Sequence, residues 1–214
     1  MNGASGADLA VFAGPSLPPS DRIVADRIAY LPPATRGDVE RASHTYRHVL
    51  LIDGVFHHDL APSPKEVYAA AQRCRLSGAA SMGALRAAEC APYGMTPVGA
   101  IALWYLRGTI DGDDEVAVLV DPATQRALTV ASVNVRFVAR CAVRARLWSP
   151  ARASDWIERS RAIFYMDRTW EDCLELLESG ARAQIEPIVR RRGDLKRQDA
   201  RFAVRRAQRV LESQ

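Results

Sequence analysis

Residues 76–90 read Leu-Ser-Gly-Ala-Ala-Ser-Met-Gly-Ala-Leu-Arg-Ala-Ala-Glu-Cys. A segment of small residues ends at Ser81, and apolar residues then recur at helical spacing from Met82 onward. This pattern predicts a strand or tight turn that delivers Ser81 to the N-terminus of a helix. The amides of Met82 and Gly83 would then point at an anion that forms beside the hydroxyl. The simpler alternative is that Ser81 is an ordinary N-cap.

Lys65 is the second residue that could take part in chemistry with Ser81. The segment Ser63-Pro64-Lys65-Glu66 has the spacing of a capping box, with proline at the first helical position. Lys65 therefore falls in a first helical turn, where the helix dipole and partial burial would favour its neutral, basic form. A Ser–Lys pair is a known variant of the serine-nucleophile arrangement. The alternative is a surface lysine without a role, in a chain whose only other lysine is Lys196.

The N-terminal half of the chain alternates short apolar runs with segments of helical periodicity. Such alternation predicts an α/β fold with a small, mainly parallel sheet flanked by helices. The predicted strands are residues 9–13, 27–31 and 48–52, and the predicted helices are residues 38–46, 64–74, 82–90 and 97–107.

The predicted strand ends suggest where a site would lie, because sites in parallel sheets gather at the carboxyl ends of the strands. Gly14, Asp53 and Ser81 all follow apolar or small-residue runs, so we expect them to lie together. The amide of Gly14 could complete an oxyanion hole, and Asp53 could position a substrate. Arg86 could face the same site and hold a carboxylate. The alternative for Arg86 is a plain surface pair with Glu89.

The second half of the chain is predicted to be mainly helical. Residues 115–120 and 127–133 predict a β-hairpin, and a helical pattern continues from there to the end. We therefore divide the chain into an α/β core, residues 1–131, and a helical region, residues 132–214. The acidic run at residues 111–115 lacks EF-hand spacing, so we interpret it as a solvated turn or a contact for a basic partner.

Charge is distributed unevenly along the chain. Its formal net charge is +4, yet residues 181–214 carry ten basic against four acidic side chains. This tail could present an electrostatic face to an acidic partner, or it could be the solvated side of a terminal helix. A basic nucleic-acid-binding tail is a rival interpretation, although we expect no nucleic acid as partner. Residues 9–180 are expected to fold without the tail.

Metal, nucleotide and membrane sites find little support in the sequence. The segment His57-His58-Asp59 lacks a third clustered ligand, and no Gly-x-Gly-x-x-Gly or Walker pattern is present. No apolar run reaches the ~18 residues that a membrane span needs. The four cysteines are scattered without a Cys-x-x-Cys pair, which suggests reduced thiols. We therefore expect a cytoplasmic protein without a metal ion or cofactor.

Several segments of the chain, in order, resemble the TfuA-like protein family. The longest is Gly78-Ala79-Ala80-Ser81-Met82-Gly83-Ala84-Leu85-Arg86-Ala87-Ala88-Glu89. The resemblance runs from about Leu9 to Trp170. The other matching segments are Phe12-x-Gly14-Pro15-Ser16-Leu17, Pro32-Pro33-x-x-x-Arg36-Gly37-Asp38, Ile52-Asp53-Gly54-Val55-Phe56, Lys65-Glu66, Tyr93-Gly94-Met95, Asp113-Asp114-Glu115-Val116-Ala117-Val118, Val133-Asn134-Val135-Arg136 and Phe164-Tyr165-x-x-Arg168-Thr169-Trp170.

The resemblance implies a role in peptide-backbone thioamidation. TfuA-like proteins work beside a YcaO enzyme, which uses ATP to activate a peptide amide. They are understood to release sulfide from the C-terminal thiocarboxylate of a small sulfur carrier of the ThiS type. A Ser–Lys pair performs this hydrolysis, and Ser81 and Lys65 match its positions. The family often has histidine before the lysine, where this chain has Pro64.

The implied partners are a YcaO cyclodehydratase-like enzyme, a ThiS-like sulfur carrier protein and a precursor peptide of ribosomal peptide natural product biosynthesis. The resemblance also implies an unusual α/β fold. The alternative function is that of a non-catalytic adaptor, which recruits the peptide or the carrier to YcaO.

Overall fold

The computed structural model describes residues 6–56 and 60–213. The chain divides into two compact units. The first consists of Met1–Asp113 together with Arg197–Gln214, and the second is Asp114–Lys196. This grouping differs from the division at residues 131 and 132 that the sequence suggested, because the last part of the chain packs with the sheet.

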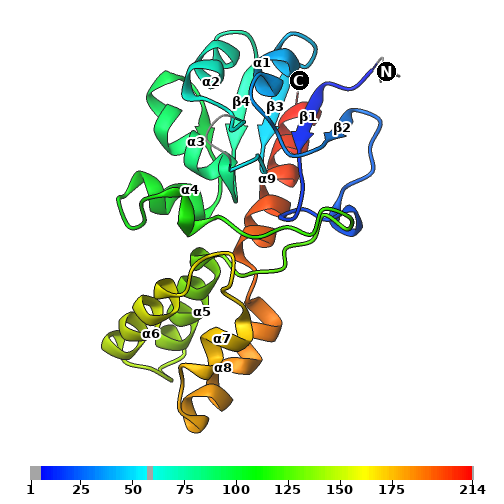
Figure 1. Cartoon of the computed structure of the whole chain (residues 1–214). Helices are drawn as coiled ribbons and strands as arrows, with labels where there is room; N and C mark the ends of the chain where they lie inside the picture. The colour runs from blue at the N-terminus through cyan, green and yellow to red at the C-terminus, as the bar shows by residue number, and fades with distance from the viewer. Residues whose placement is uncertain (1–5, 57–59, 214) are drawn as a thin grey trace. The chain divides into compact units, whose positions relative to one another are not determined.

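Five strands form the sheet of the first unit, in the order β2-β1-β3-β4-β5 (Figure 1). Every neighbouring pair of strands is parallel. The carboxyl ends of the strands therefore meet at one edge, and the predicted α/β class is confirmed. The strands are β1, Leu9–Phe12; β2, Ile28–Leu31; β3, His48–Leu51; β4, Arg75–Gly78; and β5, Thr96–Pro97.

The central strands are apolar on both faces, as expected for parallel strands that are covered on both sides. Along β1, Leu9 and Val11 belong to one core cluster, whereas Ala10 and Phe12 belong to another. Strand alternation thus builds two separate apolar layers. The layer around Ala10 and Phe12 includes residues of three helices, α1, Asp38–Ser43; α2, Pro64–Ala71; and α3, Met82–Cys90.

Helix α9, Leu195–Glu212, closes the other layer (Figure 1). The carboxylate of Asp199 accepts the N–H of Ile101 over 2.8 Å, at the start of α4, Ala100–Leu106. Burial raises the pKa of Asp199. Gly99 permits this approach, since a Cβ there would lie 2.5 Å from the Asp199 carboxyl carbon. Residues 197–214 of the tail are therefore part of the first unit, whereas residues 181–196 belong to the second, which corrects the expectation that residues 9–180 would fold without the tail.

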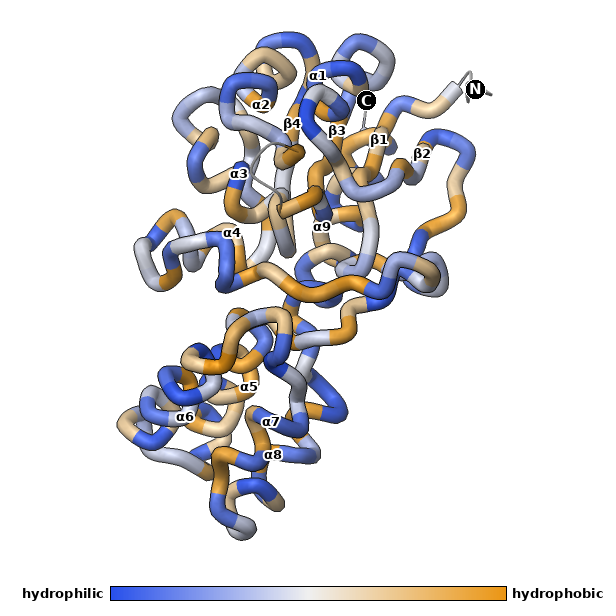
Figure 2. The backbone as a smooth tube through the Cα atoms, in the orientation of Figure 1, coloured by the Kyte–Doolittle hydropathy of each residue, from blue (hydrophilic) through white to orange (hydrophobic). Residues whose placement is uncertain are grey.

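The second unit is helical, which confirms the helical C-terminal part of the prediction. Its core includes Val135, Trp156, Cys173 and Ile185, one from each of its helices. The Trp156 indole N–H donates to the carbonyl oxygen of Cys173 over 2.7 Å. Along α6, apolar residues are interspersed among a majority of hydrophilic ones (Figure 2). The helices are α5, Ser132–Arg144; α6, Pro150–Ala162; α7, Trp170–Glu175; and α8, Ser179–Arg192.

Two features differ from the sequence-based expectation. The predicted hairpin over residues 115–120 and 127–133 is reduced to a single antiparallel bridge between Val120 and Ala127. Strand β5 was not predicted, because its two residues are too few to show a pattern. Among the described residues, no helix combines the length and apolarity needed to cross a membrane.

Candidate functional site

A strained turn joins β4 to α3. The N–H of Ser81 donates to the carbonyl oxygen of Ala79 over 2.8 Å, which closes a γ-turn. The central residue of this turn, Ala80, has a φ of +67°. A non-glycine residue at positive φ stores about 1–3 kcal/mol of backbone strain, which the surrounding packing must sustain. The prediction of a tight turn that delivers Ser81 to a helix N-terminus is confirmed.

The hydroxyl of Ser81 does not cap α3, although Ser81 occupies the N-cap position. By contrast, the hydroxyls of Ser63 and Ser149 accept backbone N–H groups at the starts of α2 and α6. Ser81 is also 2% exposed. The ordinary-cap alternative is therefore wrong for this side chain, whose oxygen is not committed to the helix.

Two glycines allow α3 to begin directly against the sheet. A Cβ on Gly83 would lie 1.8 Å from the carbonyl oxygen of Leu51, and one on Gly78 would lie 2.1 Å from that of Gly83. The Gly83 N–H donates to the Ile52 carbonyl oxygen over 3.1 Å. Gly83 therefore does not direct its amide at an oxyanion, contrary to prediction. The backbone N–H of Met82 remains available as a donor to an oxyanion, since the first amide of a helix has no intrahelical acceptor.

Asp53 holds the loop that follows β1. Its carboxylate accepts the N–H of Gly14 over 2.8 Å, the N–H of Ser16 over 3.1 Å and the Ser16 hydroxyl over 2.7 Å. These bonds occupy the Gly14 amide, so the predicted contribution of Gly14 to an oxyanion hole is not found. A Cβ on Gly14 would lie 2.5 Å from Cγ of Pro33, which explains the glycine. The role of Asp53 in this structure is thus to position a loop.

The loops that follow β2 and β3 meet beside the serine turn. Ala34 and Gly54 form an isolated parallel bridge. A Cβ on Gly54 would lie 3.0 Å from Cγ of Met82, the first residue of α3. Strands β1, β3 and β4 are neighbours, so the predicted gathering of Gly14, Asp53 and Ser81 at one sheet edge is confirmed.

Lys65 lies in the first turn of α2 with an exposed side chain. The predicted capping box is present, because Ser63 Oγ accepts the Glu66 N–H and the Glu66 carboxylate accepts the Ser63 N–H. The partial burial that the basic form of Lys65 would need is not found. No hydrogen bond joins Lys65 to Ser81, both of which the structure describes.

The start of α2 lies beside the last turn of α3. Cys90 Sγ is 3.9 Å from the carbonyl oxygen of Pro64. Ser81 immediately precedes the nine residues of α3, and Cys90 is the last of them. At 1.5 Å per residue, Ser81 and Cys90 are separated by about 13 Å along the helix. The Ser–Lys pair therefore stays a prediction that needs a movement of the Lys65 side chain.

Arg86 fixes the chain that enters α2. Its Nε donates to the carbonyl oxygen of Pro62 over 2.7 Å, and its terminal nitrogen pairs with Glu89 at 2.5 Å. The arginine side chain is only 14% exposed. The pair with Glu89 is thus present but is not a plain surface pair. A contact of Arg86 with a substrate carboxylate stays a prediction.

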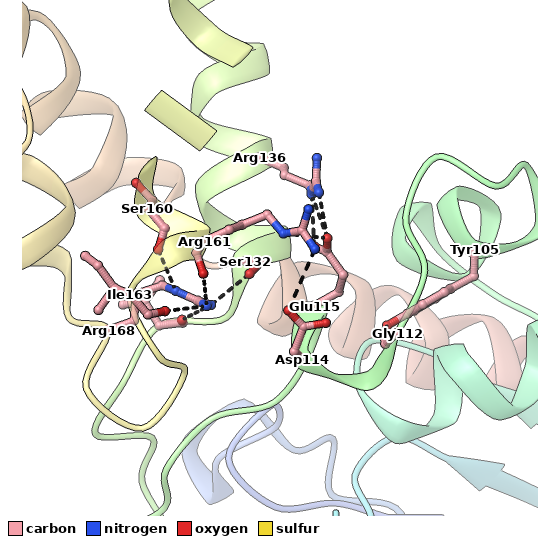
Figure 3. Close-up of polar contacts among 11 residues, drawn as sticks. Tyr105, Gly112, Asp114, Glu115, Ser132, Arg136, Ser160, Arg161, Ile163 and Arg168 are labelled. Atoms are coloured by element: carbon pink, nitrogen blue, oxygen red, sulfur yellow. Dashed lines mark hydrogen bonds and ion pairs between the residues drawn. The ribbon is translucent and has the colours of Figure 1, made fainter. Parts of the chain in front are cut away.

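A buried ion cluster lies in the second unit. The Glu115 side chain is 1% exposed, and its carboxylate accepts three bonds from Arg136 of α5, at 3.1, 2.9 and 2.6 Å (Figure 3). Arg161 of α6 lies 3.2 Å from the same carboxylate and 3.8 Å from Asp114. The expectation of a solvated acidic turn is therefore wrong for Glu115, which two arginines neutralise inside the unit.

Arg168 is a second buried cation of this unit, at 1% exposure. It donates to the carbonyl oxygens of Ser160, Ile163 and Val130 and to the hydroxyl of Ser132 (Figure 3). Burial lowers the pKa of its guanidinium. Since these bonds tie α6 to the start of α5, Arg168 acts as a structural link.

One polar pair was missed by sequence reasoning. His48 and Ser77 lie on the neighbouring strands β3 and β4, and His48 Nε2 is 2.8 Å from Ser77 Oγ. Both residues stand at positions where an apolar side chain would be expected in a buried strand. That interruption was the signal in the sequence that could have identified them.

The described residues offer no candidate metal site. Residues 6–56 and 60–213 contain no group of three or more His, Cys, Asp or Glu side chains that could hold a metal ion. The segment His57-His58-Asp59 lies outside the described residues.

The fold and the serine turn define an α/β protein with a buried serine at the N-terminus of a helix. The model of a family described as TfuA-like protein matches residues 53–169, which include α3 and the Glu115 cluster. The chain therefore belongs to the TfuA-like protein family. Membership supports an accessory role in a YcaO-associated pathway. A search of curated proteins found no match.

Proposed function

We propose that the protein hydrolyses the C-terminal thiocarboxylate of a ThiS-type sulfur carrier and thereby supplies sulfide to a YcaO enzyme. The observation that carries this proposal is the Ser81 hydroxyl, which is buried beside a helix N-terminus without capping it. The strained γ-turn at Ala80 adds support, because strain of this kind concentrates at functional sites.

The reaction begins with attack of Ser81 Oγ on the thiocarboxylate carbon. Lys65 Nζ accepts the hydroxyl proton, and the tetrahedral oxyanion is stabilised by the Met82 N–H and the dipole of α3. The Lys65 ammonium then returns its proton to the sulfur as the carbon–sulfur bond breaks, and the sulfur leaves as hydrosulfide. This step forms an ester between Ser81 and the carrier and restores the neutral lysine. Water, deprotonated by the same lysine, attacks this ester and releases the carrier carboxylate.

This mechanism requires Lys65 to approach Ser81 when the carrier binds. The lysine is exposed and extends from the N-terminal turn of α2 on a flexible four-carbon stem. A carrier docked over Ser81 would also remove water from around Lys65, which favours the neutral amine that accepts the Ser81 proton. The precursor peptide is engaged in the same encounter. Sulfide released beside YcaO then reaches the activated amide before it is diluted in the solvent.

The exposure of Lys65 favours a second candidate function. A non-catalytic adaptor would use the exposed lysine to bind the carrier or the precursor peptide and present it to YcaO. In that case Ser81 would contribute only to the packing of the turn, and its hydroxyl would be dispensable.

Sulfide release from a thiocarboxylated carrier distinguishes the two functions. Ser81→Ala should lower the rate by several orders of magnitude, about 4 kcal/mol or more, through loss of the nucleophile. Ser43→Ala is the matched control, since Ser43 is also a buried serine of the first unit. Lys65→Arg keeps the charge but cannot accept a proton, so it should fail nearly as badly. Full activity of Ser81→Ala would leave only the adaptor.

A further inference from the structure

A cavity of about 260 Å³ lies between the sheet and α9, within the first unit. His48 and Arg75 begin β3 and β4 and stand opposite each other in the register. The cavity is therefore at the amino ends of these strands, away from the serine turn at the carboxyl ends. Its polar lining consists of His48, Arg75, Ser77, Thr96 and Arg206.

The bond between His48 and Ser77 sets the direction of the Ser77 hydroxyl. His48 is 4% exposed, and burial together with the charge of Arg75 lowers its pKa to about 4. The imidazole is thus neutral at neutral pH and carries one N–H. Its Nδ1 is buried without a partner. A buried N–H without an acceptor is costlier than an unfilled lone pair, which places the proton on Nε2.

With the proton on Nε2, His48 donates to Ser77 Oγ and the serine proton is left to point elsewhere. Ser77 is then a donor toward the cavity that it lines. Thr96 adds a second hydroxyl, and Arg75 and Arg206 add two guanidinium groups. The cavity is thus lined by donors and carries no carboxylate among its lining residues.

The two arginines that line this cavity, Arg75 of β4 and Arg206 of α9, differ from two other arginines of α9. Arg197 and Arg201 of α9 both pair with Asp21. Among the residues that the structure describes, no carboxylate lies within ion-pair distance of Arg75 or Arg206. Positive charge without a counter-charge beside two hydroxyls, the buried one of Ser77 and the exposed one of Thr96, is an arrangement that binds anions.

We propose that this cavity binds an oxyanion group, a carboxylate or a phosphate, between the guanidinium groups of Arg75 and Arg206 and the hydroxyls of Ser77 and Thr96. The site is separate from Ser81 and doesn't depend on the proposed hydrolysis.

The ligand has room to extend beyond its oxyanion group. A more open cavity of about 630 Å³ adjoins the first, and Arg75, Arg206 and Val210 line both. The same cavity is also lined by Arg209 and by Phe202, which is 52% exposed. A larger anion would therefore meet further positive charge and apolar surface there.

Isothermal titration calorimetry of the full chain tests the proposal with two oxyanion probes. One is inorganic phosphate, and the other is N-acetyl-tetra-alanine with a free carboxylate. The same peptide with a C-terminal amide is the negative control. Binding of phosphate alone identifies a free anion as the ligand, and binding of the carboxylate peptide but not the amide identifies a chain end. Absence of binding by both probes overturns the proposal.

Variants localise the binding. Arg206→Gln should weaken association at least about tenfold through loss of a charge-assisted bond. Arg191→Gln removes the same charge from an exposed position of α8 that lines neither cavity, and should leave affinity within about twofold. Ser77→Ala should also weaken binding. Equal effects of Arg206→Gln and Arg191→Gln would mean unspecific attraction and would overturn the site. Since Arg206 is exposed, its variant tests the proposal even if Ser77→Ala fails to fold.

Discussion

Glu115 and Arg136 form a bidentate ion pair in which the carboxylate is buried and the guanidinium comes from α5. Removing the charge of Glu115 would leave Arg136 and Arg161 facing each other without their shared anion. The pair therefore joins the loop that precedes α5 to two helices of the second unit.

Glu115→Gln should lower the free energy of unfolding by about 3 kcal/mol, because one partner of a buried pair is removed while the other stays. Chemical denaturation of the full chain measures the effect. Glu178→Gln is the control, since Glu178 also pairs with an arginine, Arg152, but is 72% exposed. Its loss should amount to less than about 1 kcal/mol. Similar losses for the two variants would contradict the importance of burial.

Ala80→Gly should relieve the strain of the γ-turn. Glycine adopts positive φ without penalty, so the variant should be as stable as the parent protein or more stable by about 1 kcal/mol. Ala84→Gly, inside α3, should instead lower stability by about 1 kcal/mol or more. Thermal unfolding compares the two. If the strain holds Ser81 in place, Ala80→Gly should also slow sulfide release; an unchanged rate would assign the strain to packing alone.

Ala203→Asp should prevent stable folding of the first unit. Ala203 is 1% exposed in the layer between α9 and the sheet, where an unpaired carboxylate has no compensation. The expected loss is more than about 3 kcal/mol. Phe202→Asp, at the adjacent half-exposed position, should cost about 1 kcal/mol at most. Circular dichroism melting of both variants gives the comparison. Equal melting temperatures would mean that α9 is not needed for the core.

Because of His48, the stability of the protein should depend on pH in the acidic range. Its pKa is about 4 in the folded chain against 6.5 for an ordinary histidine. Between these values the unfolded chain binds a proton that the folded chain does not, so stability falls as pH drops from about 6.5 to 4. The total is about 3 kcal/mol. His48→Asn removes this titration, so denaturation curves over this pH range should slope less. Identical slopes would contradict a neutral, buried His48.

The serine turn and the central strands could be predicted because their signals are local. Ser81 follows a run of small residues and precedes a helical period, and the run at residues 48–52 is apolar throughout. Lys65 was placed correctly at a helix start for the same reason. Its exposure could not be predicted, because that depends on how α2 packs against α3.

The parts that could not be predicted depend on contacts distant in sequence. The acidic side chains of residues 111–115 suggested a turn exposed to solvent. Glu115 is nevertheless buried, and it forms ion pairs with one arginine of α5 and one of α6. Nothing in the sequence indicated that the Gly14 N–H has an acceptor. The fold brings the Asp53 carboxylate to it, and this carboxylate accepts the N–H. Because the tail is rich in basic residues, the sequence analysis did not predict that α9 has an apolar face and that this face packs against the sheet.

That α9 closes the sheet has a consequence for the order of events during synthesis. The strands emerge from the ribosome early, but one face of the sheet stays uncovered until residues 197–214 have been made. The second unit is continuous in sequence, so it can fold while that face of the sheet is still uncovered. Exposed Leu9, Val11 and Leu50 would then be a temporary target for chaperones or for aggregation, and slow translation of the last segment would prolong that exposure.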